Sequence, residues 1–218
     1  MPVQLAALLL ADGRLPVGGH VHSAGVESAV EDGRICDVES LGEYLLGRLH
    51  TVGLTEAALA AAVVLHARSI ALLDAEADAR ITVPQLRVVS RRLGRQLVRV
   101  AGRCWPDPVL ATLPDDPHQP IALGAVGLAA GLDAGTVAAI AVHHASTTPA
   151  QSAVRLLGLD PFAVAALTAS LAVEGERVAT EALTAAGGPI EDLPARTGPV
   201  VEIAAASHAS LTTRLFAS

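Results

Sequence analysis

The feature that most constrains this fold is a helical spacing of apolar residues along nearly the whole chain. Apolar side chains recur every three or four residues, whereas the alternating β-branched runs that are typical of strands are nearly absent. Of the 218 residues, 51% are apolar, yet the aromatic residues are limited to Tyr44, Trp105, Phe162 and Phe216. The core must therefore consist of Ala, Leu and Val on helices that approach closely. The sequence predicts an all-α fold.

The predicted helices belong to a single domain over residues 1–218, because no fixed-period repeat and no change in composition divides the chain. We expect one compact bundle of about ten helices. The expected ranges are 3–11, 23–32, 38–51, 54–74, 83–103, 120–131, 134–146, 149–157, 161–186 and 199–207. The Pro-rich run 106–120 is the best candidate for a surface loop or hinge. After Gly187 the chain is polar, so we expect residues 188–218 to leave the bundle as a protruding, partner-docking C-terminal tail.

One apolar stretch, residues 121–142, is long enough to cross a membrane and has Asp133 as its only charge. Gly131 is typical of a helix end and Asp133 of a helix N-cap, so these two residues divide the stretch into two short helices. We therefore expect no membrane span.

The two cysteines indicate a reducing compartment. Cys36 and Cys104 are too far apart for a CxxC motif, so we expect free and buried thiols. The apolar run 5–11 has no basic residue before it, unlike a signal peptide. We predict a cytoplasmic location.

Several catalytic classes are excluded by residue types that the sequence lacks. All 15 of its Lys and Arg residues are Arg, so neither a Schiff-base lysine nor a P-loop lysine is present. The GxSxG and HExxH motifs and an obvious pair of catalytic carboxylates are also missing. We therefore predict no catalytic residue, no bound cofactor and no enzymatic activity. The net charge of −7 argues against general nucleic-acid binding.

A basic stripe recurs every four residues on the helix predicted at 83–103. Its members are Arg87, Arg91, Arg95, Arg99 and Arg103, with Arg92 beside them. Three interpretations remain: a solvated face, salt bridges to the acidic segments 37–43 and 74–78, or a DNA-recognition helix. The first two are favoured, because the neighbourhood supplies little of a helix-turn-helix pattern. A helical DNA-binding regulator that uses Arg87–Arg103 stays as an alternative function.

Four histidines raise the alternative of an all-α metalloenzyme. His20 and His22 are two residues apart, and His143 and His144 are adjacent. Adjacent histidines on a helix point about 100° apart, so they do not share a metal unless other elements add ligands. We predict no metal site, with transient metal contact at His20 and His22 as the minority interpretation.

Glycines and a proline shape the segment 15–25. Gly18, Gly19 and Gly25 allow backbone conformations that are closed to other residues, and Pro16 stiffens the approach. The segment is typical of a tight turn that enters a helix. An anion site at that helix start is the weaker alternative, because GK[ST] and a preceding strand are missing.

Two terminal segments together resemble the urease accessory protein UreF family. The early family motif D-x-x-LP-x-GG-[FY]-x-[HY]-S-x-GLE is matched by Asp12, Leu15, Pro16, Gly18, Gly19, His22, Ser23, Gly25 and Glu27. The family's C-terminal pattern H-E-x-x-x-SRLF-x-S is matched by His208, Arg214, Leu215, Phe216 and Ser218. His20 stands where the family usually has an aromatic residue, and Ala209 where it has an acid.

Three internal segments extend the resemblance over nearly the whole chain. Residues 90–95 are similar to the family's S-R-R-M-G-R, 118–124 to its H-x-PV-x-x-G, and 151–156 to its S-A-A-V-R-L region. Each segment is short, but all five occur in the family's order.

The resemblance implies an all-α, cytosolic, homodimeric protein that acts in nickel loading of apo-urease. Such a protein binds the accessory protein UreD, also called UreH, largely through its C-terminal tail, and this pair recruits the GTPase UreG. In this chain, the matching residues from Leu15 to Glu27 and from His208 to Ser218 would be the partner-binding residues. We expect Arg214, Leu215 and Phe216 to anchor the tail, and the segment from Leu15 to Glu27 to position the GTPase.

Overall fold

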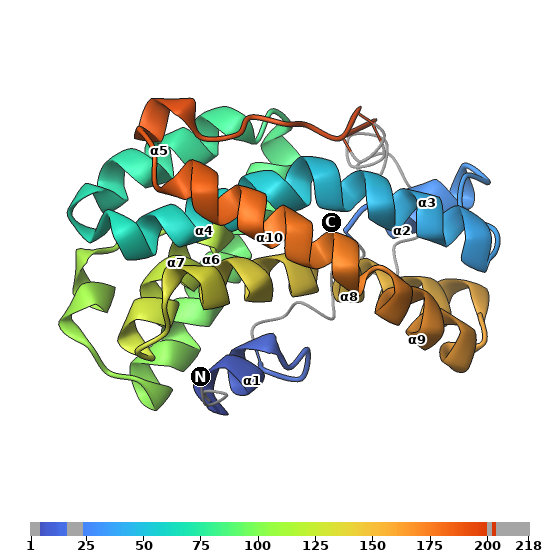
Figure 1. Cartoon of the computed structure of the whole chain (residues 1–218), viewed down its shortest axis with the longest axis horizontal. Helices are drawn as coiled ribbons and strands as arrows, with labels where there is room; N and C mark the ends of the chain where they lie inside the picture. The colour runs from blue at the N-terminus through green and yellow to red at the C-terminus, as the bar shows by residue number, and fades with distance from the viewer. Residues whose placement is uncertain (1–4, 17–23, 200–201, 204–218) are drawn as a thin grey trace.

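The computed structural model describes residues 5–16, 24–199 and 202–203, and these residues form helices and short connections without a strand (Figure 1). The α-helices are α1 (Leu5–Ala11), α2 (Val26–Glu31), α3 (Val38–Arg48), α4 (Leu54–Leu65), α5 (Ile70–Arg80), α6 (Pro84–Cys104), α7 (Gln119–Ala129), α8 (Ala134–Leu157), α9 (Pro161–Ser170) and α10 (Ala172–Ala186). A π-helical turn (Leu49–Gly53) joins α3 to α4, and 3-10 turns lie at Ala67–Ser69, Pro108–Thr112 and Ile190–Asp192. The predicted all-α fold is confirmed.

The Ala-rich helix α4 is the centre of the main core. Its residues Ala57 to Val63 are buried, and α7, α8 and α10 pack around it. The close approach of α7 depends on Gly124, because a Cβ atom at that position would lie 2.5 Å from both Ala60 O and Val63 Cβ. Small side chains thus supply the close spacing that a core with few aromatic residues requires. A smaller core lies between α2, α3, α9 and the C-terminal part of α8.

Helix α8 continues through Pro149, where the sequence predicts a break between 146 and 149. A proline inside a helix has no N–H to donate to the carbonyl four residues earlier. Here that carbonyl belongs to Ala145, and it accepts a hydrogen bond from Arg48 Nε at 3.2 Å. A side chain from α3 therefore replaces the missing backbone donor, which the sequence pattern of α8 alone does not reveal.

Two other helix boundaries differ from the predicted ranges. The helix predicted at 54–74 ends at Leu65, because His66 leaves the helical conformation, with φ −125° and ψ 47°. The His66 ring lies 2.9 Å from Ala186 O at the end of α10, so a tertiary contact accompanies this break. The helix predicted at 161–186 is divided at Leu171 into α9 and α10.

The predicted division of the apolar stretch 121–142 is confirmed. Gly131 has φ +73°, and the Asp133 carboxylate accepts a hydrogen bond from Thr136 N at 2.7 Å at the start of α8. Within the described ranges, one helical stretch, Val38–Leu65, is long and apolar enough to cross a bilayer by length and composition. In the most apolar 18-residue segment of this stretch, 61% is buried inside the bundle. Such burial is typical of a core helix in a folded domain.

The chain stays on the bundle after Gly187, where we expected it to leave. Residues 190–198, which we call the strap, run back along α10 toward α3 (Figure 1). Leu193 is 4% exposed, and Arg80 donates hydrogen bonds to Leu193 O and Pro194 O, each at 3.0 Å. Thr55 Oγ1 donates to Arg196 O at 3.0 Å. The departure predicted at residue 188 therefore does not occur within the strap, and residues 204–218 lie outside the described part.

Candidate functional site

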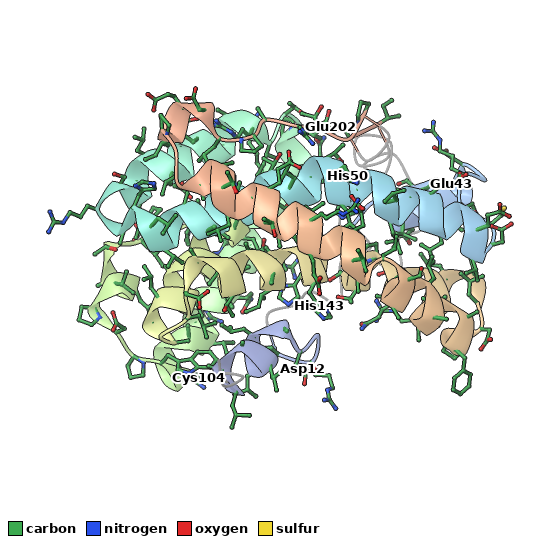
Figure 2. The ribbon with its side chains drawn as sticks, viewed as in Figure 1. Asp12, Glu43, His50, Cys104, His143 and Glu202 are labelled. Carbon is green, nitrogen blue, oxygen red and sulfur yellow. The ribbon has the colours of Figure 1, made fainter. Side chains whose placement is uncertain are left out.

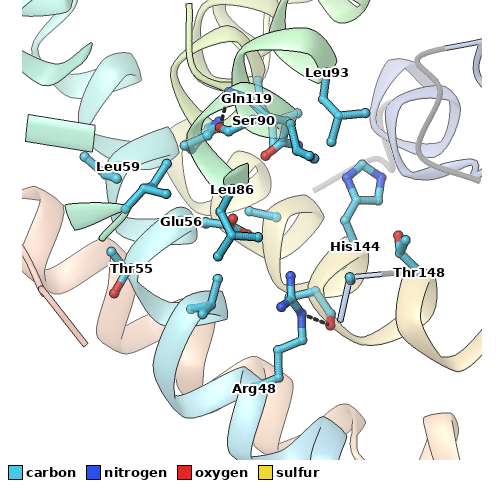
Figure 3. Close-up of a pocket in the computed structure, with 18 of the residues that line it drawn as sticks. Arg48, Thr55, Glu56, Leu59, Leu86, Ser90, Leu93, Gln119, His144 and Thr148 are labelled. Atoms are coloured by element: carbon cyan, nitrogen blue, oxygen red, sulfur yellow. Dashed lines mark hydrogen bonds between the residues drawn. The ribbon is translucent and has the colours of Figure 1, made fainter. Parts of the chain in front are cut away.

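A pocket with a cavity volume of about 210 Å³ lies between α1, α4, α6, α7 and α8 (Figure 3). Its apolar wall includes seven leucines: Leu10, Leu15, Leu59, Leu86, Leu93, Leu97 and Leu123. An apolar cavity of roughly 150 Å³ already accommodates a benzene molecule. The pocket can therefore hold an aromatic ring and part of another side chain.

Four segments that the resemblance singles out meet at this pocket, although they are far apart in the sequence. Their lining residues are Asp12, Gly13, Leu15 and Ala24 from the N-terminal segment, Ser90 and Leu93 from α6, Gln119, Pro120 and Leu123 from α7, and Gln151 and Arg155 from α8. The fold thus assembles one concave site from separate sequence motifs. We take this pocket as the candidate functional site.

A buried histidine fixes the wall between α6 and α7. His118 is 0% exposed and bonds through each ring nitrogen: Nδ1 lies 3.1 Å from Ser90 Oγ, and Nε2 lies 3.0 Å from Asp78 Oδ1. Ser90 Oγ also accepts from Gln119 N at 3.1 Å, so its hydroxyl proton points to Nδ1, and Nε2–H donates to Asp78. Burial lowers the pKa of His118, although the hydrogen bond to Asp78 opposes this shift. The lowered pKa favours the neutral ring in this network.

Most of the Pro-rich run 106–120 lies at the surface, as predicted, whereas its last residues are packed against the bundle. Its last part lies on α6 at Gly94, where a Cβ atom would come within 2.0 Å of Pro117 O. Asp107 caps the 3-10 turn by accepting from Val109 N at 2.9 Å. Gly94 and His118 together hold this run in place, which sets the position of Gln119 in the pocket.

Part of the arginine stripe on α6 forms salt bridges, as one of our interpretations predicts. Arg87 pairs with Asp78 at 3.2 Å, and Arg91 pairs with Asp74 at 3.2 Å and Asp78 at 2.8 Å. Arg91 and His118 hydrogen-bond the Asp78 carboxylate and so lower its pKa to about 2. Arg95 pairs with Asp116, an acid that we did not predict as a partner.

The remaining stripe residues, Arg92, Arg99 and Arg103, are exposed, as a solvated face requires. Within the described part of the chain, no salt bridge joins α6 to the acidic segment 37–43. The stripe is therefore divided between internal ion pairs and solvent.

The polar wall of the pocket contains Glu56 from α4 and His144 from α8 (Figure 3). Burial raises the pKa of Glu56, although the nearby Arg48 guanidinium opposes the shift. Among the described residues, no hydrogen bond or ion pair is made by the Glu56 carboxylate. Burial, with a smaller effect from His143, lowers the pKa of His144 to about 4, so its ring is neutral at neutral pH.

The two adjacent histidines do not converge. Their ring centroids are 6.1 Å apart with an angle of 52° between the rings. His143 is exposed (Figure 2), whereas His144 lines the pocket. Over the part of the chain that the structure covers, no group of three or more His, Cys, Asp or Glu side chains could hold a metal ion. His20 and His22 lie outside the described residues.

Both cysteines are exposed, so the predicted burial of their thiols is wrong. Cys36 precedes Asp37, the N-cap of α3, and Cys104 is the last residue of α6. Figure 2 shows Cys104 at the outer edge of the molecule. Helix ends present side chains to solvent more readily than the helix centres that form this core.

The N-terminal residues that we predicted as partner-binding have different surroundings. Leu15 is half-buried at the pocket and Pro16 is exposed. Gly25 has φ +87° and forms the turn into α2, while Glu27 is 3% exposed on that helix. The predicted turn is confirmed at Gly25, whereas Gly18 and Gly19 lie outside the described residues. The side chain of Glu27 is covered by other residues, so direct partner contact through it stays a prediction.

A tyrosine that we did not predict supports this turn. Tyr44 Oη donates to Ala24 O at 2.7 Å, and Ala24 has φ +55°, a conformation that is uncommon for a residue with a Cβ atom. No local signal in the sequence connects Tyr44 with the turn, because the two residues are twenty positions apart.

The other predicted partner-binding residues lie outside the described part of the chain. They are Gly18, Gly19, His22, Ser23, His208, Arg214, Leu215, Phe216 and Ser218. Their contacts stay predictions.

The structure defines an all-α protein in which four family-like segments line one pocket. The comparison with family models matches residues 35–172 to the UreF model. The chain is 44% identical to the urease accessory protein UreF of Mycobacterium sp. (strain JLS), over 97% of both chains. It is 42% identical to that of Mycolicibacterium vanbaalenii, again over 97% of each, and 40% identical to that of Mycobacterium tuberculosis, over 98% of this chain and 99% of the relative.

This chain therefore belongs to the UreF family of urease accessory proteins. The resemblance that the motifs indicate is confirmed, and it supports a role in urease maturation.

Proposed function

We propose that this protein is a scaffold for GTP-coupled nickel insertion into apo-urease. It binds the UreD/UreH accessory protein, recruits the GTPase UreG and acts as a homodimer in the cytoplasm, without catalysing a reaction itself. The observation that carries the proposal is the convergence of four family-like segments on one pocket. A protein that binds others needs such a surface, whereas it needs no reaction centre of its own.

The chemistry of GTP hydrolysis has to come from a partner under this proposal. A P-loop nucleotide site requires a lysine that reaches the phosphates, and this sequence has no lysine. A scaffold can position a GTPase and a metal-binding partner without containing either site. This division of roles is consistent with a chain in which the described pocket is mainly apolar.

The tail anchors are the part of the proposal that is simplest to test. Arg214 would form bidentate hydrogen bonds with the UreD/UreH-type protein, and Phe216 would bury apolar area against it. Removal of an anchor of this kind commonly costs about 2 kcal/mol or more of binding free energy, or roughly thirtyfold in Kd.

The first experiment is co-expression with a UreD/UreH-type protein, followed by size-exclusion chromatography with light scattering. We expect a stable complex with the full-length chain and its loss when the chain ends at Ser207. Phe162→Ala is a matched control for Phe216→Ala, because Phe162 is 83% exposed on α9 and lies outside the tail. An intact, folded full-length chain that does not bind would contradict the scaffold function.

The role of the N-terminal segment in recruiting UreG needs a separate experiment. Pro16→Ala alters an exposed residue, whereas Glu27→Ala alters a buried one. We expect Pro16→Ala to weaken recruitment of UreG by the preformed pair and to leave the melting temperature unchanged. Normal recruitment by both variants would contradict a role of this segment at the GTPase interface.

A further inference from the structure

The strap leads the chain to the rim of the pocket. Arg196 and Thr197 line the pocket, and so does Glu202. Glu202 N donates to Gly198 O at 2.9 Å, the hydrogen bond of one helical turn. The last described residue, Ile203, directly follows a residue that lines the pocket.

Three acidic residues line the pocket: Asp12, Glu56 and Glu202. Asp12 is ion-paired to Arg14 at 2.9 Å, whereas the Glu56 carboxylate has no hydrogen bond or ion pair within the described residues. The nearby Arg48 uses its Nε for Ala145 O. An arginine that enters the pocket could therefore pair with Glu56, where partial burial strengthens the interaction.

The segment 204–218 has the complementary composition. It contains Arg214 and His208 and no Asp or Glu, and Phe216 is its one aromatic residue. In an extended chain, residues two apart point to the same side, so Arg214 and Phe216 can enter one site together. Eleven extended residues span up to roughly 36 Å, so the distance from Ile203 to Arg214 does not limit this contact.

We propose that residues 204–218 of the same chain occupy this pocket when no partner is bound, with Phe216 in the cavity and Arg214 beside Glu56. The ring matches the cavity in size and apolarity, and the guanidinium matches the unpaired carboxylate in charge. If the tail also anchors the UreD/UreH-type partner, it must first leave the pocket. That consequence rests on the proposed function, whereas the self-docking does not.

The test measures how well the tail shields the pocket in the full-length protein. The exposed Cys36 and Cys104 are replaced by serine, and Thr148→Cys supplies a single thiol at the pocket wall. We expect Phe216→Ala to raise the labelling rate of this thiol by roughly tenfold, which corresponds to about 1.4 kcal/mol of lost contact. The matched control, Phe162→Ala, removes an exposed ring elsewhere and should leave the rate unchanged.

A second arm tests the charge pair. Arg214→Gln should accelerate labelling when Glu56 is present and should have no effect in the Glu56→Gln background. Circular dichroism verifies the fold of each variant, and Gln151→Cys, at an exposed position on the pocket wall, serves as a second probe. Equal labelling rates with and without Phe216 at both probes would overturn the proposal.

Dilution separates this chain's own tail from that of a second copy. Protection within one chain is independent of protein concentration, whereas protection by another molecule falls on dilution. Concentration-independent protection supports the proposal, and concentration-dependent protection overturns it in favour of exchange between copies. Because no partner protein is added, the result stays distinct from success or failure of the UreD/UreH binding experiment.

Discussion

Gly94 illustrates how a single residue can set the position of a whole connection. The run 106–120 lies so close to α6 that a methyl group at Gly94 would overlap Pro117 O. We predict that Gly94→Ala lowers the free energy of unfolding by roughly 1–3 kcal/mol, the usual cost of overpacking a tight contact. Urea denaturation measures this change.

Gly102, on the same helix, provides the matched control. A Cβ atom there meets no other atom within 4 Å, so Gly102→Ala should stabilise the protein by about 0.5–1 kcal/mol through higher helix propensity. Similar destabilisation by both substitutions would show that general helix effects, and not the contact with Pro117, are responsible.

His144 predicts a pH dependence of stability. Its pKa is about 4 in the folded state, below the ordinary value of 6.5, because the ring is buried. Between these values the unfolded chain binds a proton that the folded protein does not bind, so the free energy of unfolding decreases as the pH falls from 6.5 to 4. The slope approaches about 1.4 kcal/mol per pH unit. Denaturation curves over this interval should show a flatter dependence for His144→Gln, and an unchanged slope would contradict the assignment.

At the scale of a helix, α8 depends on a donor from another element. Arg48→Ala leaves Ala145 O without its bond from Nε, which we expect to cost roughly 1–3 kcal/mol of stability. Pro149→Ala restores an N–H that can reach the same carbonyl. The cost of Arg48→Ala should therefore be smaller in the Pro149→Ala background, as measured in a double-mutant cycle of unfolding free energies. Equal costs in both backgrounds would argue that Arg48 acts elsewhere.

Helix α8 also shows which helix boundaries can be predicted from the sequence. Gly131 and Asp133 end one helix and start the next through local backbone and capping chemistry, so their pattern predicts the boundary correctly. The continuation of α8 through Pro149 depends on Arg48, which is about a hundred residues away in the sequence. Local patterns cannot reveal a compensation that depends on tertiary structure.

For the whole molecule, Arg80 joins the strap to the bundle. Its guanidinium donates to Leu193 O and Pro194 O and also pairs with Glu76. We predict that Arg80→Met increases hydrogen exchange and proteolysis within residues 190–198 and leaves α4 protected. Arg68→Met is the matched control, because Arg68 is exposed and forms no hydrogen bond or ion pair with the described residues of the strap. Unchanged protection of residues 190–198 in Arg80→Met would contradict this role.

The arrangement of the pocket was the least predictable part of the molecule. The motifs identify Leu15, Ser90, Gln119 and Arg155 as members of separate segments, but their spacing in the sequence contains no information about their distance in space. Helix packing brings them together. The roles of Glu56 and His144 depend on the same packing. Glu56 belongs to no motif, and the sequence singles out His144 only as a possible metal ligand.

The convergence of both ends of the described chain on one pocket also affects how the protein can be handled. Leu10 on α1 and Glu202 near the last described residue line the same cavity. A tag or fluorescent protein fused directly before Leu5 or directly after Ile203 would therefore lie close to the candidate site. A dye placed on α9, near Phe162 and away from the pocket lining, would report on binding without crowding the surface under study.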